Sequence, residues 1–348
     1  MNKKYLLILA ALGLKGVAWA QSQVTLQGTT DVYIQSASTG ATHFTGEGEG
    51  GSAASRLAFR GSEDLGGGLR VNFLLEGGLF MPTGAGTLPG PGFAFTRQSL
   101  VGVSGVWGSV DLGRMYTPMF YTLLRADPFN VNTLFSSLNL IAATDAQPAL
   151  RTFAARASGM IRYRTPTQKP WIASVGYSFG NETLPEVVGG EFGFDNKKFY
   201  AGYGFQKSHA SASAAPGTAS KSSFYQVLSG AWQLTHDVRI SGNFSRIQPE
   251  TAGSTTARVW ELGAAWEMSS TSRLLASGAE RKVSGSPRGQ LTLTLGYDYL
   301  LSKHTRLYGR WLGLNNRANA AVSLASIPVA ANSGDDVRVL AIGMRHDF

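Results

Sequence analysis

The chain has 348 residues, a formal net charge of +9, 43 glycines and no cysteine. Without cysteine, it cannot rely on disulfide bonds for its stability. Beyond residue 20, no stretch approaches the roughly 18 consecutive apolar residues of a membrane-spanning helix. The positive charges do not form runs, which argues against a nucleic-acid-binding tail.

Residues 1–20 have the features of a secretory leader. Lys3-Lys4 forms a basic start, Leu6–Leu14 an apolar segment, and Ala18-Trp19-Ala20 a small-x-small cleavage pattern. The apolar segment is too short to cross a bilayer as a helix, so we expect residues 1–20 to be a cleaved signal peptide. Residues 21–348 then form a single exported domain.

The rest of the chain consists of short stretches in which apolar and polar residues alternate. The clearest is Leu291–Tyr299, where leucine and tyrosine occupy one face and threonine, glycine and aspartate the other. This period of two indicates β-strands with two different faces. Sixteen strands are predicted, at 23–35, 54–63, 68–80, 94–105, 108–115, 159–165, 171–180, 187–195, 197–207, 221–235, 237–248, 256–268, 272–283, 289–300, 304–315 and 336–348.

The connections between these strands alternate in length. Seven are tight turns, such as Asp64–Gly67 and Leu301–Lys303. The other eight are generally longer: 36–53, 81–93, 116–158, 181–186, 208–220, 249–255, 284–288 and 316–335. Longer loops on one rim and tight turns on the other are typical of an up-and-down membrane barrel. An even number of strands also places both termini on the tight-turn rim.

The chain ends on an aromatic residue, in an amphipathic strand. Across Arg338–Phe348, one face is mostly apolar and the other mostly small or charged. In hydrocarbon every backbone N–H and C=O needs a partner, so only a closed sheet avoids unpaired edges. The predicted fold is therefore all-β, a sixteen-stranded antiparallel transmembrane β-barrel of the bacterial outer membrane.

The third long loop, 116–158, is too long and too apolar for an ordinary surface loop. We expect this loop 3 to fold into the lumen, where its leucine and phenylalanine side chains pack on the wall. Thr117-Pro118 predicts the start of a short helix over Met119–Arg125. The alternative is an external lid at subunit contacts.

The sequence offers little support for an enzyme. Triads and metal centres need clustered histidines or carboxylates. The histidines instead fall in loops, turns or strand ends and share no motif: His43, His209, His236, His304 and His346. We expect no cofactor. Glu47 and Glu49, in an acidic glycine-rich loop, are weak candidates for a divalent cation at the rim.

Several segments resemble the general porins of the β-proteobacterial outer membrane. The block Ser55–Leu69 is the most specific, and Val24–Gly28, Arg97–Val103, Tyr116–Pro118 and the final Phe348 add to it. The resemblance covers essentially the whole exported chain. It implies a homotrimer in contact with outer-membrane lipid and lipopolysaccharide, and a loop 3 that narrows the pore.

The resemblance also implies a set of pore residues. In the family, arginines of the second strand, at the start of the fourth and just before the sixth line the narrowest point; these positions match Arg56, Arg97 and Arg156. Arg162 and Arg164 depart from the family pattern, in which uncharged residues are common. Both alternate with apolar neighbours and should face the lumen.

Strand alternation also places these arginines in the lumen, because a charge on the lipid face costs about 2–4 kcal/mol at mid-membrane. Arg60 shares the face of Arg56 and should also line the lumen. Loop 3 contains only two acids, Asp127 and Asp145, against basic residues that include Arg125. Such an arginine surplus predicts a preference for anions. The alternative for each arginine is a salt bridge to Glu63, Asp111, Glu261 or Glu267.

The predicted function is passive diffusion of small hydrophilic solutes, with small anions preferred. A substrate-selective channel for organic acids, phosphate or sugars is the main alternative. An outer-membrane adhesin or a purely structural barrel is a further one.

Overall fold

The computed structural model describes residues 23–40, 42–87, 92–142, 153–180, 185–209, 222–249, 255–287, 289–317, 320–321, 327–329 and 331–348. The predicted signal peptide lies outside these ranges. No helix within them has both the length and the apolar character needed to cross a membrane.

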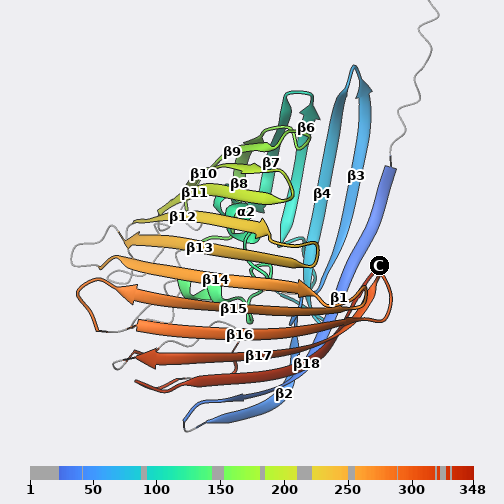
Figure 1. Ribbon diagram of the computed structural model, residues 1–348. Helices are drawn as coiled ribbons and strands as arrows, with labels where there is room; N and C mark the ends of the chain where they lie inside the picture. The colour runs from blue at the N-terminus through green and yellow to red at the C-terminus, as the bar shows by residue number, and fades with distance from the viewer. Residues whose placement is uncertain are drawn as a thin grey trace, which may run out of the picture.

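Nearly all described elements are strands of one antiparallel sheet (Figure 1). In chain order the elements are β1 (Gln23–Ser38), β2 (His43–Glu49), β3 (Arg56–Gly66), β4 (Leu69–Phe80), β5 (Ala85–Gly86), β6 (Gln98–Gly105), β7 (Gly108–Tyr116), α2 (Pro118–Leu124), η1 (Ser137–Ala142), β8 (Arg156–Arg164), β9 (Trp171–Ser178), β10 (Val187–Asp195), β11 (Phe199–His209), β12 (Ser222–Gln233), β13 (Val238–Pro249), β14 (Ala257–Glu267), β15 (Ser272–Val283), β16 (Gly289–Leu300), β17 (Thr305–Arg317) and β18 (Val337–Asp347).

In the described part of the chain, the wall has sixteen strands if β2 and β3 are counted as one and β5 is left out. β2 and β3 both pair with β1, over Val32–Ser38 and Gln23–Thr29 respectively, so together they make one interrupted wall strand. The two-residue β5 pairs only with the end of β4. The predicted barrel is confirmed, but the predicted link 36–53 contains the end of β1 and the strand β2.

The interruption between β2 and β3 is organised by Asp31. Its carboxylate accepts hydrogen bonds from the backbone N–H groups of Gly51, Ser52 and Ala53, at 2.8–3.1 Å, and from the Tyr308 hydroxyl. Asp31 is fully buried, and these four donors satisfy a carboxylate that would otherwise be costly to bury. The broken strand is therefore tied to both β1 and β17.

The first and last strands close the barrel. Thr29–Ser38 of β1 pairs with Arg338–Asp347 of β18. The ladder continues through Phe348, whose N–H and C=O bond the backbone of Gly28 at 3.0 and 2.8 Å. A Cβ at Gly28 would collide with the Phe348 ring, so this approach requires glycine. The aromatic terminus completes the closure.

Exposure of the side chains follows the predicted alternation. In β16, Leu291, Leu293 and Leu295 are 41–47% exposed on the outer face, whereas Thr292 and Thr294 are buried on the inner face. The outer face is thus apolar over most of the strands and suits a hydrocarbon surrounding.

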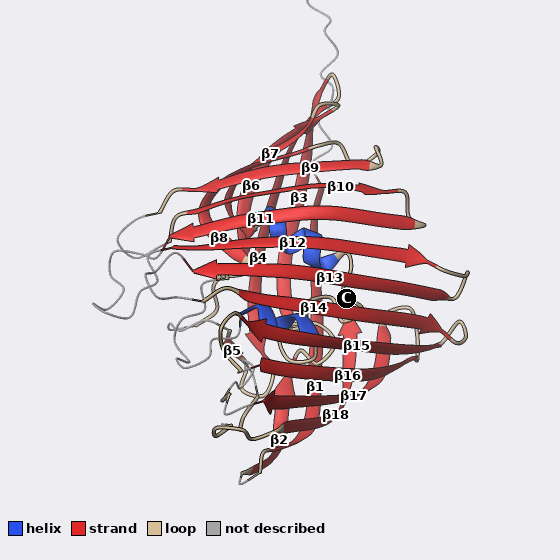
Figure 2. Cartoon of the chain, turned by 60° about the vertical axis from the view of Figure 1, so that its left-hand side comes forward, coloured by secondary structure: helices blue, strands red, loops and turns tan. Residues whose placement is uncertain are grey.

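The segment after β7 runs along the inner face of the wall. Figures 1 and 2 show α2 and η1 within the ring of strands. α2 contacts β9 to β12, and η1 contacts β14 to β16. The helix starts at Pro118, whose ring suits the first helical position. Apolar side chains of α2 and of the chain that follows it up to η1 are buried: Met119, Leu123, Phe129, Leu134, Phe135, Leu138, Leu140 and Ile141.

Candidate functional site

Two arginines converge on one carboxylate on the inner face of β3, β4 and β6. Arg97 Nε donates a hydrogen bond of 2.8 Å to Oε1 of Glu76, in β4. Arg56 Nε lies 3.6 Å from the other carboxylate oxygen of Glu76, Oε2. Strand register explains this meeting, because Arg56 pairs with Gly78 of β4, two residues from Glu76 on the same face. Glu76 was not among the salt-bridge partners considered for the arginines from the sequence.

Arg156 joins the same group through Tyr116, the last residue of β7. The Arg156 guanidinium lies 4.9 Å from the centre of the Tyr116 ring, and its Nη1 is 3.5 Å from the hydroxyl. Arg97 Nη2 donates to that hydroxyl at 2.8 Å. The three arginines matched to the family's pore positions therefore meet around one tyrosine and one carboxylate. Arginine does not lose its proton in proteins, so the cluster carries a net positive charge.

Arg114 is a further member that sequence reasoning missed. β7 has a register shift between Gly113 and Met115, and Gly113 has a φ of +132° that a side chain would strain. Such a bulge re-aims the next side chain. Arg114 then bonds Thr96 O at 2.5 Å and Ser158 Oγ at 2.7 Å, within electrostatic range of Arg156. The sequence signal for this position is a glycine directly before the arginine inside a strand pattern.

Arg162 and Arg164 share Asp111, one of the acids considered from the sequence. A nitrogen of each guanidinium lies 3.0 Å from Asp111 Oδ2. The Arg162 side chain is only 2% exposed and lies 5.4 Å from the Tyr121 ring. Arg162 therefore presents no open charge to the lumen, whereas Arg164 is 38% exposed.

Arg60 differs from these residues because it is exposed and has no ion-pair partner in the described part of the chain. It pairs across the strands with Thr25 and Leu74 on the inner face. It lies four positions closer to the tight-turn rim than Arg56. The salt bridge to Glu63, the alternative for Arg60, does not form among the described residues.

Two charged residues of loop 3, Arg125 and Asp127, hold the loop in place. Arg125 Nη1 bonds Glu191 Oε2 of β10 at 2.5 Å. Burial lowers the pKa of Arg125 and the Glu191 carboxylate raises it, with a net upward shift, so Arg125 stays charged. Asp127 is buried and accepts from the N–H groups of Phe129 and Val131 and from Ser136 Oγ.

Burial raises the pKa of Asp127, while its three hydrogen bonds lower it; the net shift is upward. Because its side chain is buried and hydrogen-bonded within the loop, Asp127 presents no open carboxylate to the lumen. Asp145 lies outside the described residues.

The rim candidates for a cation do not form a metal centre. Glu49 Oε2 accepts from Ser55 N at 3.0 Å, and Glu47 is exposed. In the described ranges, no group of three or more histidine or acidic side chains is arranged to hold a metal ion.

A second group of arginines lies on the inner face of β15, β17 and β18. Arg310 is buried and lies 2.6 Å from Asp298, which Arg306 approaches at 3.8 Å. Arg345, paired with Asp347, is within electrostatic range of both Arg56 and Arg306. The two groups thus form a continuous basic arc around the lumen. The lumenal position of Arg306 and Arg310 follows from their alternation with Leu307.

The chain is similar to known outer-membrane proteins over nearly its whole length. A family model described as Gram-negative porin matches residues 7–319. Outer membrane porin protein 32 of Delftia acidovorans is 30% identical over 363 aligned residues, which cover 99% of this chain and 100% of that protein. An outer membrane porin protein of Bordetella pertussis is 32% identical over 51% of this chain and 48% of that protein.

Solved structures agree with the barrel. An anion-selective porin from Comamonas acidovorans has a TM-score of 0.80 at 27% identity, covering 94% of this chain and 100% of that one. The trimer form of OmpT from Vibrio cholerae has a TM-score of 0.70 at 14% identity, covering 94% and 99%, and shares the fold.

The turn after α2 yields a stability prediction. Asn132 Oδ1 accepts from the N–H groups of Leu134 and Phe135, both at 2.9 Å, and its Nδ2 donates to Gly50 O at 2.6 Å. Asn132→Ala leaves two buried donors and one acceptor unpaired, and should lower the free energy of unfolding by about 2–4 kcal/mol. Urea titration in detergent, followed by tryptophan fluorescence, measures this.

Asn132→Ser is the matched variant, because its hydroxyl oxygen can still accept from the N–H groups of the turn and adds no charge at this buried site. It should be destabilised less than Asn132→Ala. Equal stability of Asn132→Ala and the parent protein would show that these bonds do not hold the turn.

Proposed function

The chain belongs to the Gram-negative porin family and is a passive diffusion channel of the outer membrane, and on that basis we propose that its arginine-lined lumen makes the channel prefer anions. Export through the signal peptide 1–20, followed by assembly of 21–348 as the barrel, is part of this proposal.

One observation carries the preference: Arg56 and Arg97 share the carboxylate of Glu76, and Arg156 joins them through the Tyr116 hydroxyl. Arg60 and the second arginine group extend the positive charge along the wall. Fixed charges in a lumen with low-dielectric walls act more strongly than in open water. An anion is attracted along this path and a cation is repelled.

In the described part of loop 3, no acid is open to the lumen to offset this field. Asp127 is buried and Glu191 is paired with Arg125. The similarity to an anion-selective porin, at 27% identity, supports the same conclusion.

The double variant Arg56→Gln, Arg156→Gln tests the preference. The ratio of chloride to potassium permeability should fall about tenfold, which corresponds to about 1.4 kcal/mol of lost discrimination. The zero-current potential across a planar bilayer under a potassium chloride gradient gives the ratio. Lys169→Gln with Lys198→Gln, on the exposed tight-turn rim, removes the same charge and should change the ratio little. A cation-selective parent channel would refute the proposal.

The converging arginines also bear on the alternative of a substrate-selective channel. Guanidinium groups bind the paired oxygens of carboxylates and phosphates in a forked geometry and offer no such fit to neutral sugars. We therefore expect organic acids and phosphate to pass faster than sugars of similar size. Liposome swelling over a panel of solutes measures this; equal rates for acids and sugars would indicate a general pore without such selection.

Trimer formation is supported by a segment on the outer wall. Phe93 lies over Gly77 of β4, and Phe95 packs on Phe59 of β3, with ring centres 6.1 Å apart. The predicted strand 94–105 starts only at Gln98 because this segment leaves the sheet. In the described part of the chain, none of the N–H groups of residues 93–95 donates a hydrogen bond. Such backbone is unfavourable against lipid, so a second copy is the expected cover.

Phe93→Asp tests this interface. Phe93 is 42% exposed in one chain and should be buried between copies, where a carboxylate would weaken assembly. Electrophoresis of unheated samples should show monomeric barrels in place of trimers. Phe179→Asp is the control, since Phe179 is 63% exposed at the long-loop rim and distant from that face. A trimer of unchanged heat resistance in Phe93→Asp would exclude this interface.

A further inference from the structure

The outer face of β13 to β15 carries three cations in a row near the long-loop rim. Arg246 of β13 pairs directly with Arg258 of β14, and Arg258 pairs directly with Lys282 of β15. They share the outward face of Trp260, which is 56% exposed. Like charges directly opposite each other destabilise a sheet. An arrangement of this kind indicates an anion that neutralises the row.

The row continues across the next strands. Arg317 of β17 is separated from Lys282 only by Gly289, and Arg338 of β18 lies on the same face. Glu280 is the acid within the row and bonds Lys282 at 3.2 Å and Arg317 at 2.8 Å. In the described ranges, Arg246, Arg258 and Arg338 are exposed and have no carboxylate partner.

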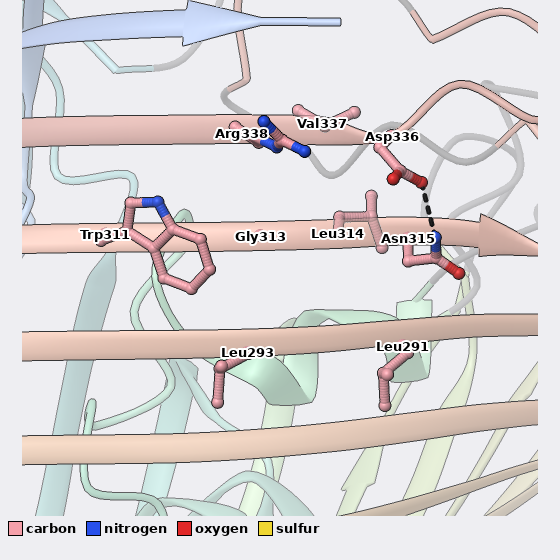
Figure 3. Close-up of a pocket in the computed structure, with 9 residues that line it drawn as sticks. All are labelled: Leu291, Leu293, Trp311, Gly313, Leu314, Asn315, Asp336, Val337 and Arg338. Atoms are coloured by element: carbon pink, nitrogen blue, oxygen red, sulfur yellow. Dashed lines mark hydrogen bonds between the residues drawn. The ribbon is translucent and has the colours of Figure 1, made fainter.

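Two apolar hollows lie below this basic row, on either side of Trp311. The first, of about 390 Å³, is bounded by Leu291, Leu293 and Trp311, whose ring lies over Gly313. Asn315, Asp336 and Arg338 line it toward the rim, and Asn315 Nδ2 donates to Asp336 Oδ1 at 2.8 Å (Figure 3).

The second hollow, of about 610 Å³, lies over Gly309. A Cβ at Gly309 would meet no atom within 4 Å, so the wall is recessed there. Its lining is almost wholly apolar and includes Trp266, Leu295, Leu340 and Ile342.

The level of the row in the membrane follows from the cost of exposed charge. Arginine and lysine on the lipid face cost about 2–4 kcal/mol at mid-membrane but roughly 0–1 kcal/mol near the interface. The row therefore lies at headgroup level. In outer-membrane barrels the longer loops face outward, so these headgroups belong to the outer leaflet.

We propose that this face binds lipopolysaccharide, with the lipid A phosphates on the basic row and acyl chains in the two hollows. The proposal rests on the outer-membrane location and names the site of lipid contact. Guanidinium groups bind phosphate oxygens in pairs. β13 and β17 are four strand spacings apart, or about 19 Å, a width that suits a lipid with more than one phosphate and several chains.

The triple variant Arg258→Gln, Lys282→Gln, Arg338→Gln tests the basic row. Each basic residue at an anionic headgroup contributes roughly a fivefold factor, so the affinity of the refolded full barrel for bisphosphorylated lipid A should fall about 100-fold. Titration calorimetry in detergent, with native mass spectrometry of retained lipid, measures it. Lys169→Gln, Lys198→Gln, Lys303→Gln removes three charges from the opposite rim and should bind as the parent does. Equal binding by both triple variants would overturn the proposal.

The hollows are tested separately with Gly309→Leu, which places a side chain in the recess where a Cβ meets no atom within 4 Å. This variant should weaken binding of both bisphosphorylated and dephosphorylated lipid A, whereas the triple variant should affect only the former. If phosphatidylglycerol binds as tightly as lipid A, the face is a general surface for anionic lipids and not a specific site, and the proposal is overturned. The ion selectivity of these lipid-site variants should equal that of the parent protein. A failure of the lipid-binding proposal can therefore be told apart from a failure of the proposed anion preference.

Discussion

The whole architecture depends on pairing the backbone hydrogen-bonding groups in a surrounding that offers no water. A sheet in hydrocarbon has to close, and here the closure extends to the last residue, Phe348, whose N–H and C=O both bond Gly28. Where the backbone leaves the strand ladder, a side chain accepts the hydrogen bonds of its N–H groups. Asp31 supplies its carboxylate to three N–H groups at the break between β2 and β3.

Closure also separates two environments, and the placement of charge follows from this. Inward positions on the wall hold the arginines, because the lipid face at mid-membrane excludes them. Inside, their effect on a passing ion depends on how each is neutralised. Arg162 is paired with Asp111 and lies beside the Tyr121 ring, whereas Arg56 and Arg97 share Glu76 and Arg156 lies beside them on Tyr116. The field of the lumen therefore arises from an imbalance of partners and not from the number of arginines.

The outer wall is divided as well. Over β3 and β4, the segment 93–95 packs on the outer wall, and its N–H groups donate no hydrogen bond within the described part of the chain. Over β13 to β18, the wall is apolar, recessed beside Trp311 and edged with cations. The same β-sheet thus presents a face suited to another protein copy and a face suited to lipid. Register between strands creates both, since it sets which side chains stand next to each other.

Alternation, turn residues and loop lengths were sufficient to establish the barrel, its strand number and the inward direction of Arg56, Arg60, Arg162 and Arg164. These features are local, because a period of two assigns every residue in a strand to a face. The resemblance to the family added the positions matched to Arg97 and Arg156. Alternation does not predict which residues lie opposite each other on neighbouring strands or across the lumen.

Only the tertiary structure decided which charges cancel. Glu76 as the partner of Arg97, the burial of Asp127 and the row from Arg246 to Arg317 all depend on register and closure. Those contacts join residues far apart in the chain, and their energies depend on distance and burial, which strand periodicity does not contain. The sequence by itself determined the wall and its two faces; folding determined the electrical character of each face.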